Sequence, residues 1–64
     1  MYFVYILKSL IREDSYYVGF TTDMDSRLHI HNRGDVSATA PYRPWELKTF
    51  LAFNDRSRAL EFEK

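Results

Sequence analysis

The 64-residue chain contains no cysteine, only two glycines and two prolines, and carries no net charge. The lack of cysteine excludes disulfide bonds and zinc sites built from thiolates. Nine Lys and Arg residues balance nine Asp and Glu residues, unlike the basic composition typical of strong nonspecific nucleic-acid binders. A chain of this length forms one domain, 1–64, near the lower size limit for a core without cross-links.

The chain also has no long hydrophobic segment. Its longest apolar run, from Tyr2 to Leu7, is far shorter than the roughly 20 residues of a membrane-spanning helix. No stretch has the pattern of a secretory signal, so we expect a cytoplasmic protein that does not associate with membranes. The last residues, 61–64, stop within a helical pattern and without a stop signal, so we expect the domain to be truncated at this end.

The chain does contain enough apolar and aromatic residues for a packed core, and 17% of its residues are aromatic. Residues 2–7 and 16–20 are rich in β-branched and aromatic residues and flank the polar turn 11–15, which predicts an antiparallel hairpin. Residues 45–53 show an alternating pattern of apolar side chains, which predicts a third strand. In that strand we expect one side to carry the residues Trp45, Leu47, Leu51 and Phe53.

Two helices are expected between and after these strands. Thr22-Asp23-Met24-Asp25 matches the Ser/Thr-x-x-acid pattern of a helix start, and Gly34 supplies a stop. A polar loop, 35–43, follows, and Asn54-Asp55 caps a second helix that carries Ala59, Leu60 and Phe62. The order β-β-α-β-α predicts an α+β fold in which helices flank a three-stranded antiparallel sheet.

The segment from the second strand into the first helix concentrates polar and aromatic groups. Gly19, near the end of the strand, indicates a close backbone approach or a conformation that a Cβ would forbid. Arg27 and His31 are four residues apart, so they share one helix face. That face borders the apolar stripe of Met24 and Leu28. We therefore expect both polar groups at the rim of the sheet, close to Tyr17.

An ordered set of motifs resembles the GIY-YIG nuclease family over nearly the whole chain. The set consists of Val4-Tyr5-Ile6, Tyr17-Val18-Gly19, Thr21, Arg27-Leu28, His31-Asn32, Gly34 and Glu61. The chain is most similar to small stand-alone members related to the nuclease domain of the excinuclease C subunit. Each motif alone is common in structural strands and helices, and the specificity lies in the ordered combination.

The resemblance implies a compact three-stranded sheet with helices and hydrolysis of DNA phosphodiester bonds, with DNA repair or recombination as the expected setting. It also implies one divalent ion, Mg²⁺ or Mn²⁺. Matched residue by residue, it places Tyr5, Tyr17, Arg27 and His31 in the catalytic site, Glu61 as the metal ligand and Gly19 as a structural residue.

The residue types suit that chemistry. The planar guanidinium of Arg27 matches phosphate oxygens, and a carboxylate such as Glu61 is a hard ligand for Mg²⁺. His31, with an ordinary pKa of about 6.5, can accept a proton near neutral pH. Tyr5 or Tyr17 can do so only if its pKa falls well below about 10. The choice of general base among these three residues stays open.

Some positions depart from the family pattern, and other functions remain open. Val4 and Val18 replace a glycine and an isoleucine without loss of chemistry, whereas Phe20 stands where some members carry a lysine. The alternatives are a nucleic-acid-binding module with little catalysis and a protein-interaction domain that uses exposed aromatics and the Pro41–Pro44 segment. Because so small a domain makes few phosphate contacts, we expect a longer chain or a protein partner to assist DNA binding.

Overall fold

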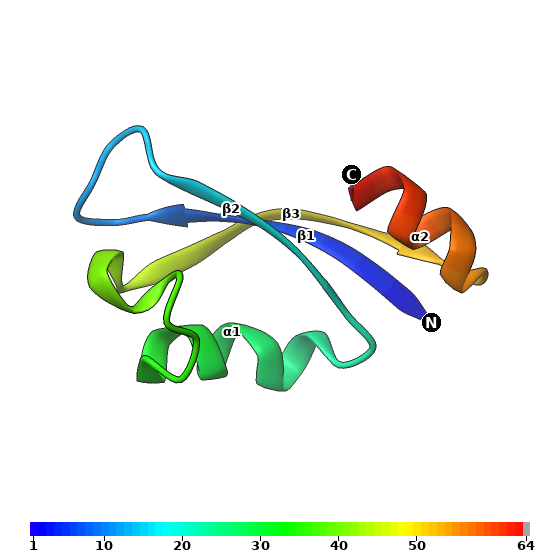
Figure 1. The fold of residues 1–64 in the computed structure, drawn as a ribbon, viewed down its shortest axis with the longest axis horizontal. Coiled ribbons are helices and arrows are strands. Elements are labelled where there is room, and N and C mark those ends of the chain that lie inside the picture. The colour runs from blue at the N-terminus through cyan, green and yellow to red at the C-terminus, as the bar shows by residue number, and fades with distance from the viewer. Residues whose placement is uncertain (64) are drawn as a thin grey trace.

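A computed structural model describes residues 1–63 and confirms the predicted order of elements. The three strands form an antiparallel sheet in the order β2-β1-β3. Helix α1 lies against one face of this sheet and helix α2 against the other (Figure 1). The elements are β1 (Tyr2–Ser9), β2 (Tyr16–Thr21), α1 (Met24–Arg33), the 3-10 helix η1 (Ala40–Tyr42), β3 (Trp45–Phe53) and α2 (Arg56–Glu63).

The central strand β1 supplies most of the core. Its side chains alternate between the two faces, so Tyr5 and Leu7 point toward α1 while Val4 points toward α2. Tyr5 and Leu7 are fully buried and pack with Trp45 of β3. The α1 face therefore holds the hydrophobic centre of the domain, and the central strand carries a tyrosine into it.

Strand β3 does not keep its apolar residues on one side, and that prediction was wrong. The pairing register shifts between Ile6 and Leu7, where β3 contains an extra residue. A bulge of one residue reverses the side on which all following side chains point. Before the bulge, Leu47 faces α1 in the core; after it, Leu51 lies beside Val4 on the α2 face.

Helix α1 begins one residue later than predicted and ends as predicted. The N-cap is Asp23, not Thr22, and its side chain accepts a hydrogen bond from the backbone N–H of Ser26 at 3.4 Å. Gly34 ends the helix in the left-handed conformation with a φ of 86°. A residue with a Cβ is strained in that conformation, which explains the glycine. Among residues 1–63, neither α-helix has the length and apolar character needed to cross a membrane.

The predicted polar loop 35–43 contains η1 and a fully buried residue, Thr39. The indole Nε1–H of Trp45 donates to the carbonyl oxygen of Thr39 at 2.8 Å. The backbone N–H of Tyr42 donates to the same oxygen at 3.2 Å. The core tryptophan therefore holds this part of the loop against the end of α1.

Asn32 joins the end of α1 to the start of β3. Its Oδ1 accepts the backbone N–H of Trp45 at 2.6 Å, and its Nδ2 donates to the Trp45 carbonyl at 3.1 Å. One side chain thus satisfies both backbone groups of a buried strand residue. This pair of bonds sets the position of α1 relative to the sheet.

We predict that the substitution Asn32→Ala lowers the free energy of unfolding by about 1–3 kcal/mol, because it leaves the backbone groups of Trp45 unpaired. Urea denaturation followed by tryptophan fluorescence measures this change. Asn54→Ala, at an exposed position in the turn before α2, is the control and stays within about 0.5 kcal/mol of the parent, because the side chain that accepts the Ser57 N–H is that of Asp55, not Asn54. Equal stability of the two variants would contradict the prediction.

Candidate functional site

The fold brings together four of the predicted site residues on the α1 face of the sheet. Tyr5 lies on β1, Tyr17 on β2, and Arg27 and His31 on α1. The Tyr17 ring lies 4.9 Å from the His31 ring and 6.4 Å from the Tyr5 ring, measured between centroids. Residues far apart in the sequence therefore form one compact cluster of aromatic rings around a guanidinium.

Gly19 is directly opposite Tyr5 in the sheet. A Cβ at Gly19 would overlap the Tyr5 ring and its hydroxyl, so only glycine leaves room for the phenol. This confirms the predicted close approach. The structural role of Gly19 is to let the Tyr5 side chain lie flat over β2 and reach α1.

A chain of hydrogen bonds runs through the cluster. Arg27 Nε donates to Tyr5 Oη at 3.0 Å, and Tyr5 Oη lies 2.9 Å from His31 Nε2. His31 Nδ1 lies 2.7 Å from Thr39 Oγ1. We refer to Arg27, Tyr5, His31 and Thr39 as the hydrogen-bond chain.

The chemistry of the partners assigns a direction to this chain. Arg27 has no acceptor, so the Tyr5 hydroxyl hydrogen goes to His31 Nε2. His31 is then neutral with its hydrogen on Nδ1, and it donates to Thr39 Oγ1. The Thr39 hydroxyl in turn donates to the Val36 carbonyl at 3.3 Å. In residues 1–63 this arrangement gives a partner to every buried side-chain nitrogen and oxygen.

The local electrostatics agree with that assignment. Burial raises the pKa of Tyr5 above its ordinary value, although the bond and charge of Arg27 oppose the rise. Burial lowers the pKa of His31, and the nearby Arg27 charge lowers it further. The bond to Tyr5 raises the pKa of Arg27. At neutral pH the site therefore contains a neutral phenol, a neutral imidazole and one cation.

That cation has no carboxylate partner in the part of the chain that the structure describes. The ion pairs there join Arg33 to Asp35 and Lys48 to Glu46, both exposed. The acceptor for Arg27 is instead a neutral hydroxyl, which leaves its positive charge uncompensated. The bond occupies Nε, so the Nη1 and Nη2 groups are the donors that can face an anion.

Burial divides the cluster into two classes. Tyr5, His31 and Thr39 are 0% exposed, whereas Arg27 and Tyr17 are each partly exposed. A ligand from solvent thus meets the guanidinium and the Tyr17 ring first. The buried residues lie behind them and fix their positions.

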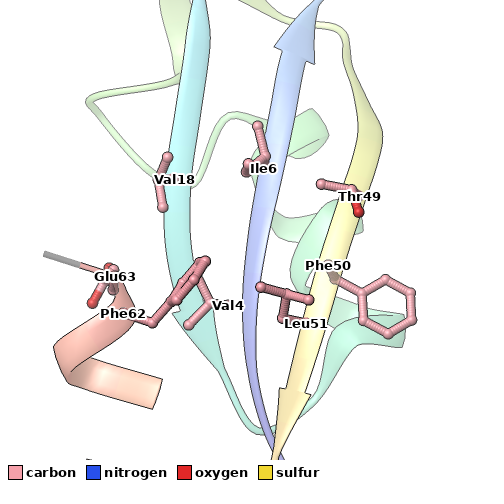
Figure 2. Close-up of a pocket in the computed structure, with 8 residues that line it drawn as sticks. All are labelled: Val4, Ile6, Val18, Thr49, Phe50, Leu51, Phe62 and Glu63. Atoms are coloured by element: carbon pink, nitrogen blue, oxygen red, sulfur yellow. The ribbon is translucent and has the colours of Figure 1, made fainter. Parts of the chain in front are cut away.

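The predicted metal ligand, Glu61, is not part of this cluster. It is exposed on α2 and lies with Phe53, Arg58 and Phe62 on the opposite face of the sheet. The half-buried Glu63 lies at the end of α2 beside β2 (Figure 2). Its negative charge is among the causes that raise the pKa of Tyr5.

The donor set fits a hard ion that needs few protein ligands. Residues 1–63 contain no group of three or more His, Cys, Asp or Glu side chains that could hold a metal. Mg²⁺ is commonly bound by one or two carboxylates, and waters and substrate phosphate complete its coordination. A single carboxylate of α2 is enough protein ligand for that mode.

The sequence interpretation missed the roles of two residues in this region. Thr39 lies in a loop without a recognisable motif, so nothing in the sequence indicated that its hydroxyl reaches His31. Asn32 was included in a motif but without its role in binding Trp45.

We predict that an NMR pH titration gives His31 a pKa below the ordinary value of about 6.5. Since the unfolded chain binds this proton at higher pH than the folded chain, the free energy of unfolding falls as the pH drops below about 6.5. Denaturation at pH 7.5 and pH 5.5 measures this loss in the free energy of unfolding. The substitution His31→Gln makes the loss smaller, whereas His29→Gln, at an exposed site of α1, leaves it unchanged. A measured pKa at or above 6.5 would show that the imidazole is not held neutral.

Comparison with known proteins agrees with this architecture. The family model described as the GIY-YIG catalytic domain matches residues 1–64. Among curated proteins, the chain is similar to the structure-specific endonuclease subunit SLX1 of Chaetomium globosum, with 41% identity over 98% of the chain and 21% of that protein. The corresponding values are 38%, 98% and 20% for SLX1 of Podospora anserina, and 38%, 97% and 18% for slx1 of Talaromyces marneffei.

The chain thus spans about a fifth of the length of these relatives. No solved structure matched the chain significantly. The endonuclease names of the relatives agree with the class of enzyme expected from the sequence. The full-length match to the family model and the β-β-α-β-α fold lead to one conclusion: the chain belongs to the GIY-YIG family.

Proposed function

We propose that this domain is a divalent-metal-dependent endonuclease that hydrolyses DNA phosphodiester bonds. The observation that carries the proposal is the uncompensated guanidinium of Arg27, held by the neutral hydroxyl of Tyr5 at a partly exposed position. Such a group binds an anion with planar geometry, and a phosphodiester is that kind of anion. The relatives are named structure-specific endonuclease subunits, which favours branched DNA as substrate and a second protein as partner.

In this proposal Arg27 binds the scissile phosphate and stabilises the charge that develops on it. The Nε bond to Tyr5 fixes the plane of the guanidinium, so the terminal amino groups are oriented before substrate arrives. Donors that are oriented in advance cost no reorganisation during the reaction. The full positive charge is retained because the neighbouring phenol and imidazole are neutral.

Burial narrows the choice of general base. Tyr5 and His31 are 0% exposed and their polar atoms are already bonded, so we assign them as positioning residues. Tyr17 is partly exposed, with its ring against His31. It is therefore the phenol that can orient the attacking water.

A carboxylate of α2 would hold the Mg²⁺ or Mn²⁺ ion. The resemblance assigns this role to Glu61, which is exposed on α2, and Glu63 on the same helix is the second candidate. When bound, the ion supplies Lewis-acid stabilisation of the phosphate and the leaving oxygen.

We predict that the substitution Arg27→Ala lowers cleavage at least about 100-fold, as expected when a preoriented donor to the reacting group is removed. The assay uses plasmid, single-stranded and branched DNA with Mg²⁺ or Mn²⁺, and the chelator EDTA abolishes the activity. Arg33→Ala on the same helix is the matched control, because Arg33 is exposed and paired with Asp35. Equal cleavage by both arginine variants would contradict this site.

We further predict that Glu61→Gln, which removes the expected metal ligand, reduces metal-dependent cleavage more strongly than Glu63→Gln on the same helix. Titration of cleavage with Mn²⁺ separates weaker metal binding from slower chemistry. The opposite order of the two variants would assign the role to Glu63. Salt-sensitive DNA binding without cleavage in any variant would instead indicate a nucleic-acid-binding module.

A further inference from the structure

We propose that Thr39 is a positioning residue of this site. It fixes the tautomer of His31 and thereby, through the Tyr5 hydroxyl, the orientation of the Arg27 guanidinium. The effect on cleavage rests on the proposed function, whereas the effect on the hydrogen-bond chain does not.

Thr39 occupies a position that its backbone holds rigidly. Its carbonyl accepts hydrogen bonds from Trp45 Nε1 at 2.8 Å and from the Tyr42 N–H at 3.2 Å. Its own N–H donates to the Val36 carbonyl at 3.1 Å. None of these bonds uses the hydroxyl. The side-chain oxygen is therefore presented to His31 by a frame that would survive its removal.

The hydroxyl oxygen determines which ring nitrogen of His31 carries the hydrogen. Thr39 Oγ1 lies 2.7 Å from Nδ1, and its hydrogen points to the Val36 carbonyl at 3.3 Å. The oxygen therefore accepts a hydrogen bond from Nδ1–H. With the ring hydrogen on Nδ1, the lone pair of Nε2 faces Tyr5, as required for the phenol to donate.

Loss of this acceptor would be transmitted to Arg27. A fully buried Nδ1–H without a partner is unfavourable, so the ring hydrogen would move to Nε2. The Nε2–H and the Tyr5 O–H would then compete for the same space, and the phenol hydrogen would lose its acceptor. The hydroxyl would rotate toward Arg27 Nε–H, which is also a donor, and the bond that holds the guanidinium would weaken.

The test compares Thr39→Val, which replaces the hydroxyl with a methyl group of similar size, with Thr39→Ser, which keeps the hydroxyl. Thr49→Val, at an exposed position on the α2 face, is the control. The first measurement is ¹⁵N NMR of the folded protein without metal or DNA. The Trp45 Nε1–H signal reports whether the frame around Thr39 is intact.

We expect His31 in the parent, in Thr39→Ser and in Thr49→Val to give the pattern of a single Nδ1–H tautomer. In Thr39→Val the two ring nitrogens should shift toward the Nε2–H form, and the Arg27 Nε–H should exchange faster with water. If Thr39→Val does not fold, Thr39→Ala provides the same comparison. An unchanged tautomer in the variants without a hydroxyl would overturn the proposal, as would a Thr39→Ser variant that behaves like Thr39→Val.

In the DNA cleavage assay, Thr39→Val should lower kcat about 10-fold to 100-fold, a range typical when a residue that orients a functional group is lost. KM should change little, because Arg27 stays charged and only its orientation is affected. Cleavage by Thr39→Val within twofold of Thr49→Val would overturn the link to Arg27. If the parent cleaves no DNA, the proposed function fails, while the NMR comparison still decides the role of Thr39.

Discussion

The structure of the site depends on one buried hydroxyl, that of Tyr5. It extends from the central strand over Gly19 and bonds to Arg27 and His31 of α1. Because Arg27 can only donate, this hydroxyl accepts from the guanidinium and donates to the imidazole, the direction that the Nδ1–H tautomer of His31 requires. The Tyr5 oxygen therefore joins the sheet to α1, and the bond between His31 and Thr39 extends this connection to the loop.

This arrangement also explains how a domain with no net charge can attract an anion. The positive charge of Arg27 is held by neutral partners, whereas the exposed Arg33 is neutralised by Asp35. A buried ion pair would have positioned Arg27 equally well, but it would have cancelled the charge that a phosphate needs. The buried phenol and imidazole thus provide orientation without neutralisation, and local distribution matters more than the total charge.

The two faces of the sheet have different roles because of the bulge in β3. The α1 face holds the core and the hydrogen-bond chain, whereas the α2 face carries a groove lined by side chains such as Val4, Ile6 and Leu51 (Figure 2). Glu63 lies where α2 meets the edge strand β2, so its charge reaches Tyr5 from the other side of the sheet. An edge strand is the place where groups from both faces can approach one ligand.

The sequence alone determined the order of elements, because periodicity and caps are local properties of the chain, and its ordered motifs indicated the family. The resemblance to that family then singled out Tyr5, Tyr17, Arg27 and His31. Only the tertiary structure decided which of these residues are buried, since exposure depends on what packs above each side chain. The bulge in β3, the bond from Thr39 to His31 and the difference between Glu61 and Glu63 likewise depend on contacts between distant segments. Such contacts follow from the register and packing of the whole sheet, and no local pattern in the sequence encodes them.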